Sequence, residues 1–246
     1  MPSSELTRKI GLARALSKLG YCSRSQAATL IREGHVRLNG VLRRHPEWPV
    51  RLGRDWVEID GASLAPASYQ YWMMNKPRGL VTTASDEKGR ATIYSLLDPA
   101  SPWLAPVGRL DKASEGLLLL TNDSEWGQRV LDPATHLEKT YHVQIDTLAD
   151  NALFANLRRG VIEAGERLRA QRVEYLRSGV KNSWLKITLD EGKNRQIRRM
   201  LAACGVEVLR LVRVAIGPLT LGDLAKGAVR ELTADEKRAL NRALRS

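Results

Sequence analysis

The sequence predicts an α+β protein of two domains: a small helical hairpin with short strands, then a larger domain built on a mixed, mainly antiparallel sheet. Residues 1–66 begin with two segments of helical apolar spacing. Beyond residue 70, strand-like segments outnumber helical ones and follow one another closely, as they do in hairpins. Residues 61–70 are small and contain Pro66, which is typical of a linker. We therefore place the domains at 1–66 and 67–246.

The composition indicates an anionic partner. The chain of 246 residues has a net charge of +12 and a pI near 10.0, which favours nucleic acid over a membrane. No apolar run is long enough to span a bilayer, and Met1–Thr7 lacks the apolar core of a signal peptide. Cys22 and Cys204 form no Cys-x-x-Cys motif, and the histidines are scattered. We expect a cytoplasmic protein with no metal, no cofactor and no membrane partner.

The smaller domain is predicted to start with a helix over residues 10–19. Ser23 is expected to cap a second helix that ends at Gly34. Two short strands follow at Val36–Leu38 and Trp56–Ile59. Residues 1–66 hold 11 Lys and Arg against 6 Asp and Glu, so this domain carries much of the positive charge.

The second helix and its flanks, from Leu19 to Gly40, have the sequence L-G-Y-C-S-R-S-Q-A-A-T-L-I-R-E-G-H-V-R-L-N-G. A basic hairpin of this kind is often only a solvated surface. This one resembles the S4 RNA-binding domain, a family that lays two helices along structured RNA. The low aromatic content also favours recognition of a folded RNA by shape over base stacking. The resemblance implies that RNA phosphates bind Arg8, Lys9, Arg24, Arg32 and Arg37.

The larger domain is predicted to alternate strands with short helices. Its most distinct segment is the run of four leucines at Leu117–Leu120, which indicates a fully buried strand. Helical spacing and a capping box predict helices at Ile93–Leu97, after Ser124, at 150–160, within Glu191–Gly205 and from Thr233. Strands are expected at Tyr71–Asn75, Leu80–Thr83, Glu138–Ile145, Arg169–Leu176, Trp184–Leu189, Val206–Val214 and Ile216–Leu221.

A charged loop lies directly before the leucine strand, in the segment G-R-L-D-K-A-S-E-G-L-L-L-L-T-N-D from Gly108 to Asp123. A carboxylate so close to a core must be paired and hydrogen-bonded. Arg109 and Asp111 could be loop solubilisers, as in most Arg-x-Asp triplets. The long pattern, however, closely resembles the central motif of the pseudouridine synthases, in the branch that modifies ribosomal RNA. That resemblance makes Asp111 the catalytic residue, and it implies that Arg109 fills the space left by the target base or grips the flanking phosphate.

Three further segments match motifs of the same family. Lys-Pro-Arg-Gly matches its first motif, so Lys76 is expected to support the site among the substrate-binding residues. Lys-Thr-Tyr-His-Val matches the tyrosine motif, in which the ring of Tyr141 would stack on the target uracil. Arg-Gln-Ile-Arg-Arg matches the third motif. This match implies that the guanidinium of Arg198 lies against Asp111, and that Ile197 packs near the base.

The resemblance implies isomerisation of a specific uridine to pseudouridine in structured ribosomal RNA. The N-glycosidic bond is broken, the uracil is turned, and C5 is joined to the sugar, without a redox change or a dinucleotide fingerprint. The base must first be flipped out of its stack, at a cost of about a few kcal/mol. Whether Asp111 adds to the sugar carbon or abstracts its C2′ proton is left open. Tyr141 and Arg198 complete the expected catalytic group.

Two other interpretations have weaker support. A glycosidase needs a second carboxylate at a characteristic separation, and Glu115 is near Asp111 in sequence but forms no convincing acid/base pair. A non-catalytic S4-type ribosome-binding or assembly factor would be expected to lose the motifs of the larger domain, and all of them are present. We therefore expect an enzyme. The segments that start at Ser183 and Arg195 favour large-subunit over small-subunit RNA, and a monomer is the default state because the sequence carries no signal for oligomerisation.

Overall fold

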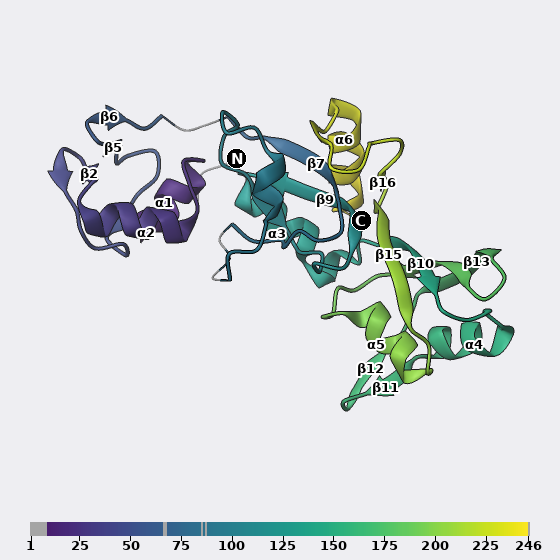
Figure 1. Ribbon diagram of the computed structural model, residues 1–246. Helices are drawn as coiled ribbons and strands as arrows, with labels where there is room; N and C mark the ends of the chain where they lie inside the picture. Colours follow the sequence, from purple (N-terminus) through teal and green to yellow (C-terminus); the bar gives the residue numbers. More distant parts are fainter. Residues whose placement is uncertain (1–8, 66–67, 85, 87, 246) are drawn as a thin grey trace. The chain divides into compact units, whose positions relative to one another are not determined.

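The computed structural model describes residues 9–65, 68–84, 86 and 88–245, and it divides into two compact units (Figure 1). The first unit holds the residues up to Gln70, with the short segments Asp98–Ala105 and Thr121–Ser124. The second unit holds Tyr71–Leu97, Pro106–Leu120 and the residues from 125 onward. The division by contacts therefore falls at residue 70, close to the expected linker, and two later segments join the first unit.

The first unit is built from two helices and short antiparallel strands. Helix α1 is Leu12–Lys18 and helix α2 is Arg24–Glu33. A capping box starts α2, because the Ser23 hydroxyl accepts from the Gln26 amide at 3.2 Å and the Gln26 side chain accepts from the Ser23 amide at 3.0 Å. The strands of this unit are β1 Ile10–Gly11, β2 Val36–Leu38, β3 Val41–Leu42, β4 Pro49–Val50, β5 Val57–Ile59 and β6 Ala62–Ser63. One sheet has the strand order β3-β2-β5-β6, and β1 pairs with β4. The predicted helical hairpin and both predicted strands are confirmed.

The second unit is organised around one sheet, which has nine strands within the described ranges, in the order β13-β14-β10-β15-β9-β7-β17. Strand β16 adds to β15, and β8 adds to β9. The pairs β10/β14, β10/β15, β13/β14 and β7/β17 are antiparallel, while β9 and β15 run parallel. The strands are β7 Tyr71–Lys76, β8 Ala105–Val107, β9 Glu115–Thr121, β10 Lys139–Ile145, β13 Arg172–Ser178, β14 Ser183–Leu189, β15 Val208–Ile216, β16 Leu219–Thr220 and β17 Val229–Glu231. The predicted mixed, mainly antiparallel sheet is therefore confirmed.

Helices cover the sheet over two separate cores. One core gathers Val143, Leu185 and Leu211 of the sheet with Leu157 of α4 and Leu201 of α5. The other packs β9 and β7 against α3 and α6, and includes residues such as Leu117, Met73, Trp126 and Leu240. The helices are α3 Ser124–Leu131, α4 Asn151–Arg159, α5 Gln196–Ala203 and α6 Ala234–Ala243, with 3-10 turns η1 Ile93–Leu96 and η2 Pro133–Thr135 and a small hairpin of β11 Val161–Glu163 and β12 Glu166–Leu168.

The close contact of β9 with β15 depends on Gly116. This glycine has φ +102°, and a Cβ there would lie 2.2 Å from the Arg213 carbonyl oxygen. Since no other residue fits that gap, Gly116 lets the loop before β9 lie directly against β15.

One predicted strand is wrong. Leu80–Thr83 does not join the sheet, and only Val81 forms a single bridge, with Thr92. The physical reason is a competing partner: the Thr82 hydroxyl donates to the Leu110 carbonyl at 2.8 Å and accepts from the Leu110 amide at 3.3 Å. This segment therefore supports the loop that contains Asp111. Within the described ranges, no helix has the length and apolar character that crossing a bilayer requires.

Candidate active site

The site is centred on the loop between β8 and β9, which carries Asp111. The Lys76 ammonium, at the end of β7, donates to the Asp111 carbonyl at 3.2 Å and to the Ser114 carbonyl at 2.9 Å. The Gly79 amide donates to the Lys112 carbonyl at 2.8 Å. Together with Thr82, these contacts fix the backbone of the loop, so the position of Asp111 is set by residues that lie well before it in the chain.

Lys76 does not line the pocket, and its expected place among the substrate-binding residues stays a prediction. Its side chain is fully buried, and it makes a third hydrogen bond to the Pro77 carbonyl at 3.1 Å. Burial lowers the pKa of Lys76 to about 8, although the charges of Asp111 and Glu115 oppose this effect. Lys76 supports the loop from inside the core.

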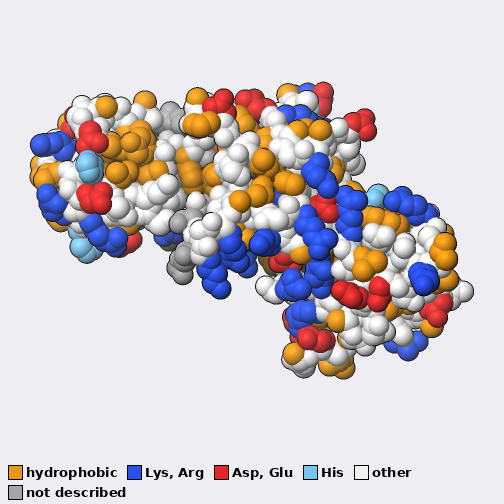
Figure 2. Space-filling view, in the orientation of Figure 1, with side chains coloured by type: hydrophobic (Ala, Val, Ile, Leu, Met, Phe, Trp, Pro, Cys, Tyr) orange, Lys and Arg blue, Asp and Glu red, His pale blue; other side chains and the backbone are white. Residues whose placement is uncertain are grey.

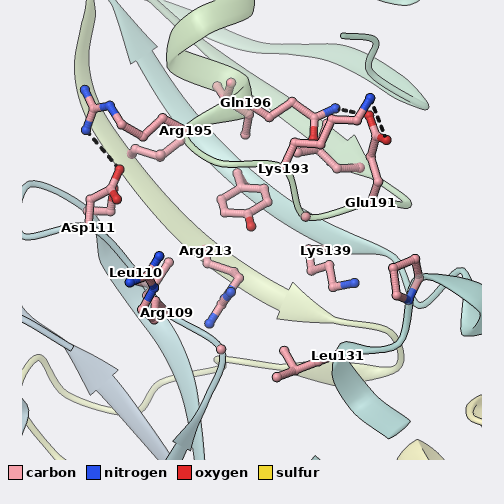
Figure 3. Close-up of a pocket in the computed structure, with 18 residues that line it drawn as sticks. Arg109, Leu110, Asp111, Leu131, Lys139, Glu191, Lys193, Arg195, Gln196 and Arg213 are labelled. Atoms are coloured by element: carbon pink, nitrogen blue, oxygen red, sulfur yellow. Dashed lines mark hydrogen bonds and ion pairs between the residues drawn. The ribbon is translucent and has the colours of Figure 1, made fainter. Parts of the chain in front are cut away.

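The Asp111 carboxylate is 37% exposed and forms an ion pair with Arg195, whose Nη1 lies 3.0 Å from Oδ2 (Figure 3). Arg195 immediately precedes α5 and has a left-handed backbone, with φ 48°. The pair therefore links the loop to the start of a helix that comes much later in the chain.

Arg198 is not the arginine that pairs with Asp111, contrary to expectation. Its Nη1 donates to the Val208 carbonyl at 3.1 Å and its Nη2 donates to the Ala113 carbonyl at 3.3 Å. Burial and the charge of Arg195 lower the pKa of Arg198, while the charge of Asp111 opposes them. Arg198 lies within the first turn of α5, and its guanidinium hydrogen-bonds to backbone carbonyls of β15 and of the Asp111 loop. Arg198 therefore links these three segments.

A pocket of about 200 Å³ opens beside Asp111. Four of the predicted site residues line it: Arg109, Asp111, Tyr141 and Ile197. Figure 3 shows Arg195 and Gln196 on one side of the pocket, with Arg109, Arg213 and Lys139 on the other. The lining residues that the sequence analysis missed include Ser114, Lys139, Glu191, Lys193, Arg195, Gln196 and Arg213.

Two of the missed residues are buried cations. Lys139 stands two positions before Tyr141 on β10, and strand alternation could have placed both on one face. Arg213 lies between apolar residues of β15, and arginine is rarely buried in a strand without a partner. This position is the signal in the sequence that could have pointed to a functional role for Arg213. Burial and the charge of Arg213 lower the pKa of Lys139, while Asp190 opposes them.

Glu115 does not take part in the pocket. Its side chain is 4% exposed, and its carboxylate pairs with Arg210 at 2.8 Å and with Lys226 at 2.7 Å. Burial opposes its ionisation, but the hydrogen bonds and charges of Arg210 and Lys226 outweigh burial, so the pKa of Glu115 is lowered. A locked carboxylate of this kind cannot be the second acid or base of a glycosidase.

In the first unit, Lys9, Arg24, Arg32 and Arg37 are all exposed. Arg37 also donates to the Gly40 carbonyl at 3.1 Å. Arg8 lies outside the described residues. On the second unit, Figure 2 shows Lys and Arg side chains gathered beside α5 and β15. Both units therefore offer positive charge of the kind that binds a polyanion.

The arrangement suits chemistry on a nucleotide. An ionised carboxylate at the edge of a pocket can act on a sugar carbon or take a proton from one, and the paired arginine fixes its orientation. The walls combine an aromatic ring and an apolar side chain with several hydrogen-bonding groups, as pockets for flipped bases do.

The family model described as RNA pseudouridylate synthase matches residues 70–203, and the model described as S4 domain matches residues 10–55. The chain is 35% identical over 232 residues to the ribosomal large subunit pseudouridine synthase B of Bacillus subtilis (strain 168), covering 93% of this chain and 94% of that relative. It is also 35% identical over 237 residues to an RNA pseudouridine synthase of Aquifex aeolicus (strain VF5), covering 96% of this chain and 95% of the relative. A solved crystal structure of a pseudouridylate synthase has a TM-score of 0.65 at 31% identity, covering 94% of this chain and 99% of that one. These similarities extend over nearly the whole chain.

Proposed function

The chain belongs to the RNA pseudouridylate synthase family, and on this premise we propose that it converts one uridine of structured ribosomal RNA to pseudouridine with Asp111 as the catalytic carboxylate. The observation that supports this proposal most strongly is the ion pair of Asp111 with Arg195, at 3.0 Å, beside a pocket that Tyr141 and Ile197 line.

Asp111 has one of two roles in the proposed reaction. It adds to C1′ of the ribose as the bond to N1 breaks, or it removes the C2′ proton. Both roles need a carboxylate held in one orientation, and the pairing with Arg195 holds it. Replacement of the C2′ hydrogen by deuterium separates the two routes, because only proton removal makes the rate sensitive to that substitution.

The target base must leave its stack before it can enter the pocket. We propose that Tyr141 stacks on the flipped uracil, that Ile197 packs beside it, and that the exposed Arg109 occupies the vacated space or holds a flanking phosphate. Flipping costs about a few kcal/mol, which the contacts in the pocket and along the flanking RNA must offset. Arg198 contributes to the reaction by holding the loop and the helix together.

Ribosomal RNA is the proposed substrate because the chain combines an S4 domain with the synthase domain. Exposed cations of the S4 domain, among them Arg24, Arg32 and Arg37, would bind the phosphates of a folded RNA. The Bacillus subtilis relative is named as a large-subunit enzyme, which supports large-subunit over small-subunit RNA. We also propose that the protein acts as a monomer in the cytoplasm.

The test is to map pseudouridines in ribosomal RNA from cells with and without this gene. One position in large-subunit RNA should lose its modification in the absence of the gene. An unchanged map would favour the alternative, a non-catalytic ribosome-binding or assembly factor, and a loss confined to small-subunit RNA would correct the choice of subunit.

A further inference from the structure

Two buried cations of the pocket make no ion pair with any residue that the structure describes. Lys139 is 9% exposed, and its ammonium forms no hydrogen bond or ion pair with any residue that the structure describes, although the charge of Asp190 favours its protonated form. Arg213 is 6% exposed; its Nε donates to the Leu117 carbonyl at 2.7 Å, but its buried Nη2 has no hydrogen-bond partner in the described part of the chain. Both residues line the pocket beside Asp111.

The sheet places these two cations around Tyr141. Lys139 and Tyr141 are two positions apart on β10, so their side chains lie on the same face. Arg213 on β15 lies directly opposite Tyr141 in the antiparallel register. A ring that stacks on Tyr141 would therefore have Lys139 and Arg213 at its edges, where the oxygens of a base are found.

A buried cation that makes no ion pair is costly, and for Lys139 the attraction of the Asp190 charge offsets only part of the lost hydration. The lowered pKa of Lys139 reflects this cost, because burial and the charge of Arg213 both disfavour its protonated form. The cost is offset when an anion enters the pocket. Lys139 and Arg213 therefore have the character of a preformed anion site.

We propose that Lys139 and Arg213 bind the oxygens of the target uracil and stabilise the negative charge that the ring acquires when its bond to the ribose breaks. This inference rests on the proposed function. As the C1′–N1 bond breaks, its electron pair stays with the ring and spreads over N1, O2 and O4. C5 then uses a ring electron pair to bond to C1′, and the proton on C5 is finally replaced by one on N1. Donors placed where charge develops lower the barrier, as an oxyanion hole does.

The flanking phosphates are a less suitable ligand for these two cations. Lys139 and Arg213 are both more than nine-tenths buried, whereas Arg109 and Arg195 are exposed and within easier reach of the RNA backbone. The same pair also disfavours cytidine, because the amino group of cytosine would place a donor where O4 of uracil accepts.

The experiment measures single-turnover cleavage of the C1′–N1 bond with Lys139→Met, on RNA with uridine or 5-fluorouridine at the target. We expect the rate on uridine to fall about 100-fold, comparable to the removal of one oxyanion-hole donor. The fall should be markedly smaller on 5-fluorouridine, because fluorine withdraws electrons and stabilises the departing ring by itself. RNA affinity should stay near the wild-type value.

The matched control is Lys186→Met, on the neighbouring strand β14. Lys186 pairs with Glu174 and is opposite His142, the residue after Tyr141, so it lies on the other face of the sheet. This variant should react at the wild-type rate on both RNAs. Equal falls in rate for Lys139→Met on the two RNAs, or no fall at all, would overturn the inference. A wild-type protein that converts no uridine would instead refute the proposed function.

Lys139→Arg provides a second test if Lys139→Met does not fold. Arginine keeps the positive charge and glutamine removes it, so Lys139→Arg should keep a rate on uridine close to wild type and Lys139→Gln should not. Equal falls in rate for these two variants would contradict a charged role for Lys139.

Discussion

Lys76 is a residue on which the position of the Asp111 loop depends. Its ammonium donates to the carbonyls of Pro77, Asp111 and Ser114 from a fully buried position. Removing the ammonium would take one donor from each carbonyl, and the Asp111 carbonyl would keep the hydrogen bond from the Ser114 amide at 2.9 Å. A buried carbonyl left without any donor costs about 1–3 kcal/mol. The interior of the second unit is thus involved directly in orienting Asp111.

This arrangement predicts an unusual dependence of stability on pH. The pKa of Lys76 is lowered by burial from the ordinary 10.5 to about 8, so between these values the unfolded chain binds the proton more strongly. Raising the pH through that window therefore stabilises the wild type relative to Lys76→Met, by at most about 1.4 kcal/mol per pH unit. Urea unfolding of both proteins across the window of roughly pH 7.5 to 10 measures the difference, and parallel curves would contradict the account.

Arg195 and Arg198 are expected to differ when each is replaced by Met. Arg198→Met should lower the free energy of unfolding by about 1–3 kcal/mol, because the carbonyls of Ala113 and Val208 lose their donor. Arg195→Met should leave stability close to wild type and slow the reaction, since the Asp111 carboxylate loses its ion pair. Thermal melts and single-turnover rates separate the two effects, and a stable, fully active Arg195→Met would show that the pair is dispensable.

At the scale of residues, the sequence could indicate the members of the site but not their partners. Asp111, Tyr141 and Ile197 were predicted from motifs and line one pocket. Three arginines stand close together in the third motif, and the one that pairs with Asp111 is Arg195, which has a left-handed backbone just before α5. The burial of Lys139 and Arg213 depends on which strands pair with β10 and β15, and this pairing cannot be read from the sequence.

Strand β15 is the element that assembles the site. It pairs with β10, which carries Tyr141, and runs parallel to β9, which follows the Asp111 loop. It starts beyond residue 203, where the match to the synthase family model ends. The segments that follow, including α6, therefore complete the second unit.

Helix α6 is predicted to be essential for this unit. Leu240 is fully buried among residues of β9, α3 and β15. Leu240→Ala should lower the free energy of unfolding by about 2–5 kcal/mol, because apolar burial is reduced and a cavity is left behind. Denaturant unfolding measures this, with Arg238→Ala on the exposed side of the same helix as the control. Equal stabilities of the two variants would mean that α6 is not part of the core.

Elements with strong local patterns were predicted correctly, and those set by distant contacts were not. The leucine strand β9 and the capping box at Thr233 and Glu236 follow from local sequence. The segment Leu80–Thr83 has strand-like residues, but Thr82 hydrogen-bonds to Leu110 in the loop. The hairpin of β11 and β12 has strands of 3 residues each, too short for a periodic pattern.

At the scale of the whole molecule, we propose that the first unit supplies much of the RNA affinity and that the second unit carries the chemistry. Replacing Arg24, Arg32 and Arg37 together by Ala should weaken RNA binding and reduce its salt dependence. Each phosphate that is no longer neutralised makes the slope of log K against log salt shallower by about 0.7–0.9, so the total change should be about 2–3. The rate at saturating RNA should fall much less than the rate at limiting RNA.

The control for this prediction removes the same charge from α6 and the residues after it, by replacing Arg238, Arg242 and Arg245 with Ala. All three are exposed. The salt slope of this control should stay near wild type. Equal slopes for the two triple variants would mean that net charge, and not the S4 surface, determines binding.

The central claim is that Asp111 carries out the isomerisation, and Asp111→Asn tests it most directly. Asn keeps the size of the side chain and removes the charge, so folding and RNA affinity should remain close to wild type. The measurement is the amount of pseudouridine formed by purified protein on ribosomal RNA in a single turnover. We predict one pseudouridine per RNA with wild type and none with Asp111→Asn. Appreciable conversion by the pure variant would contradict the claim.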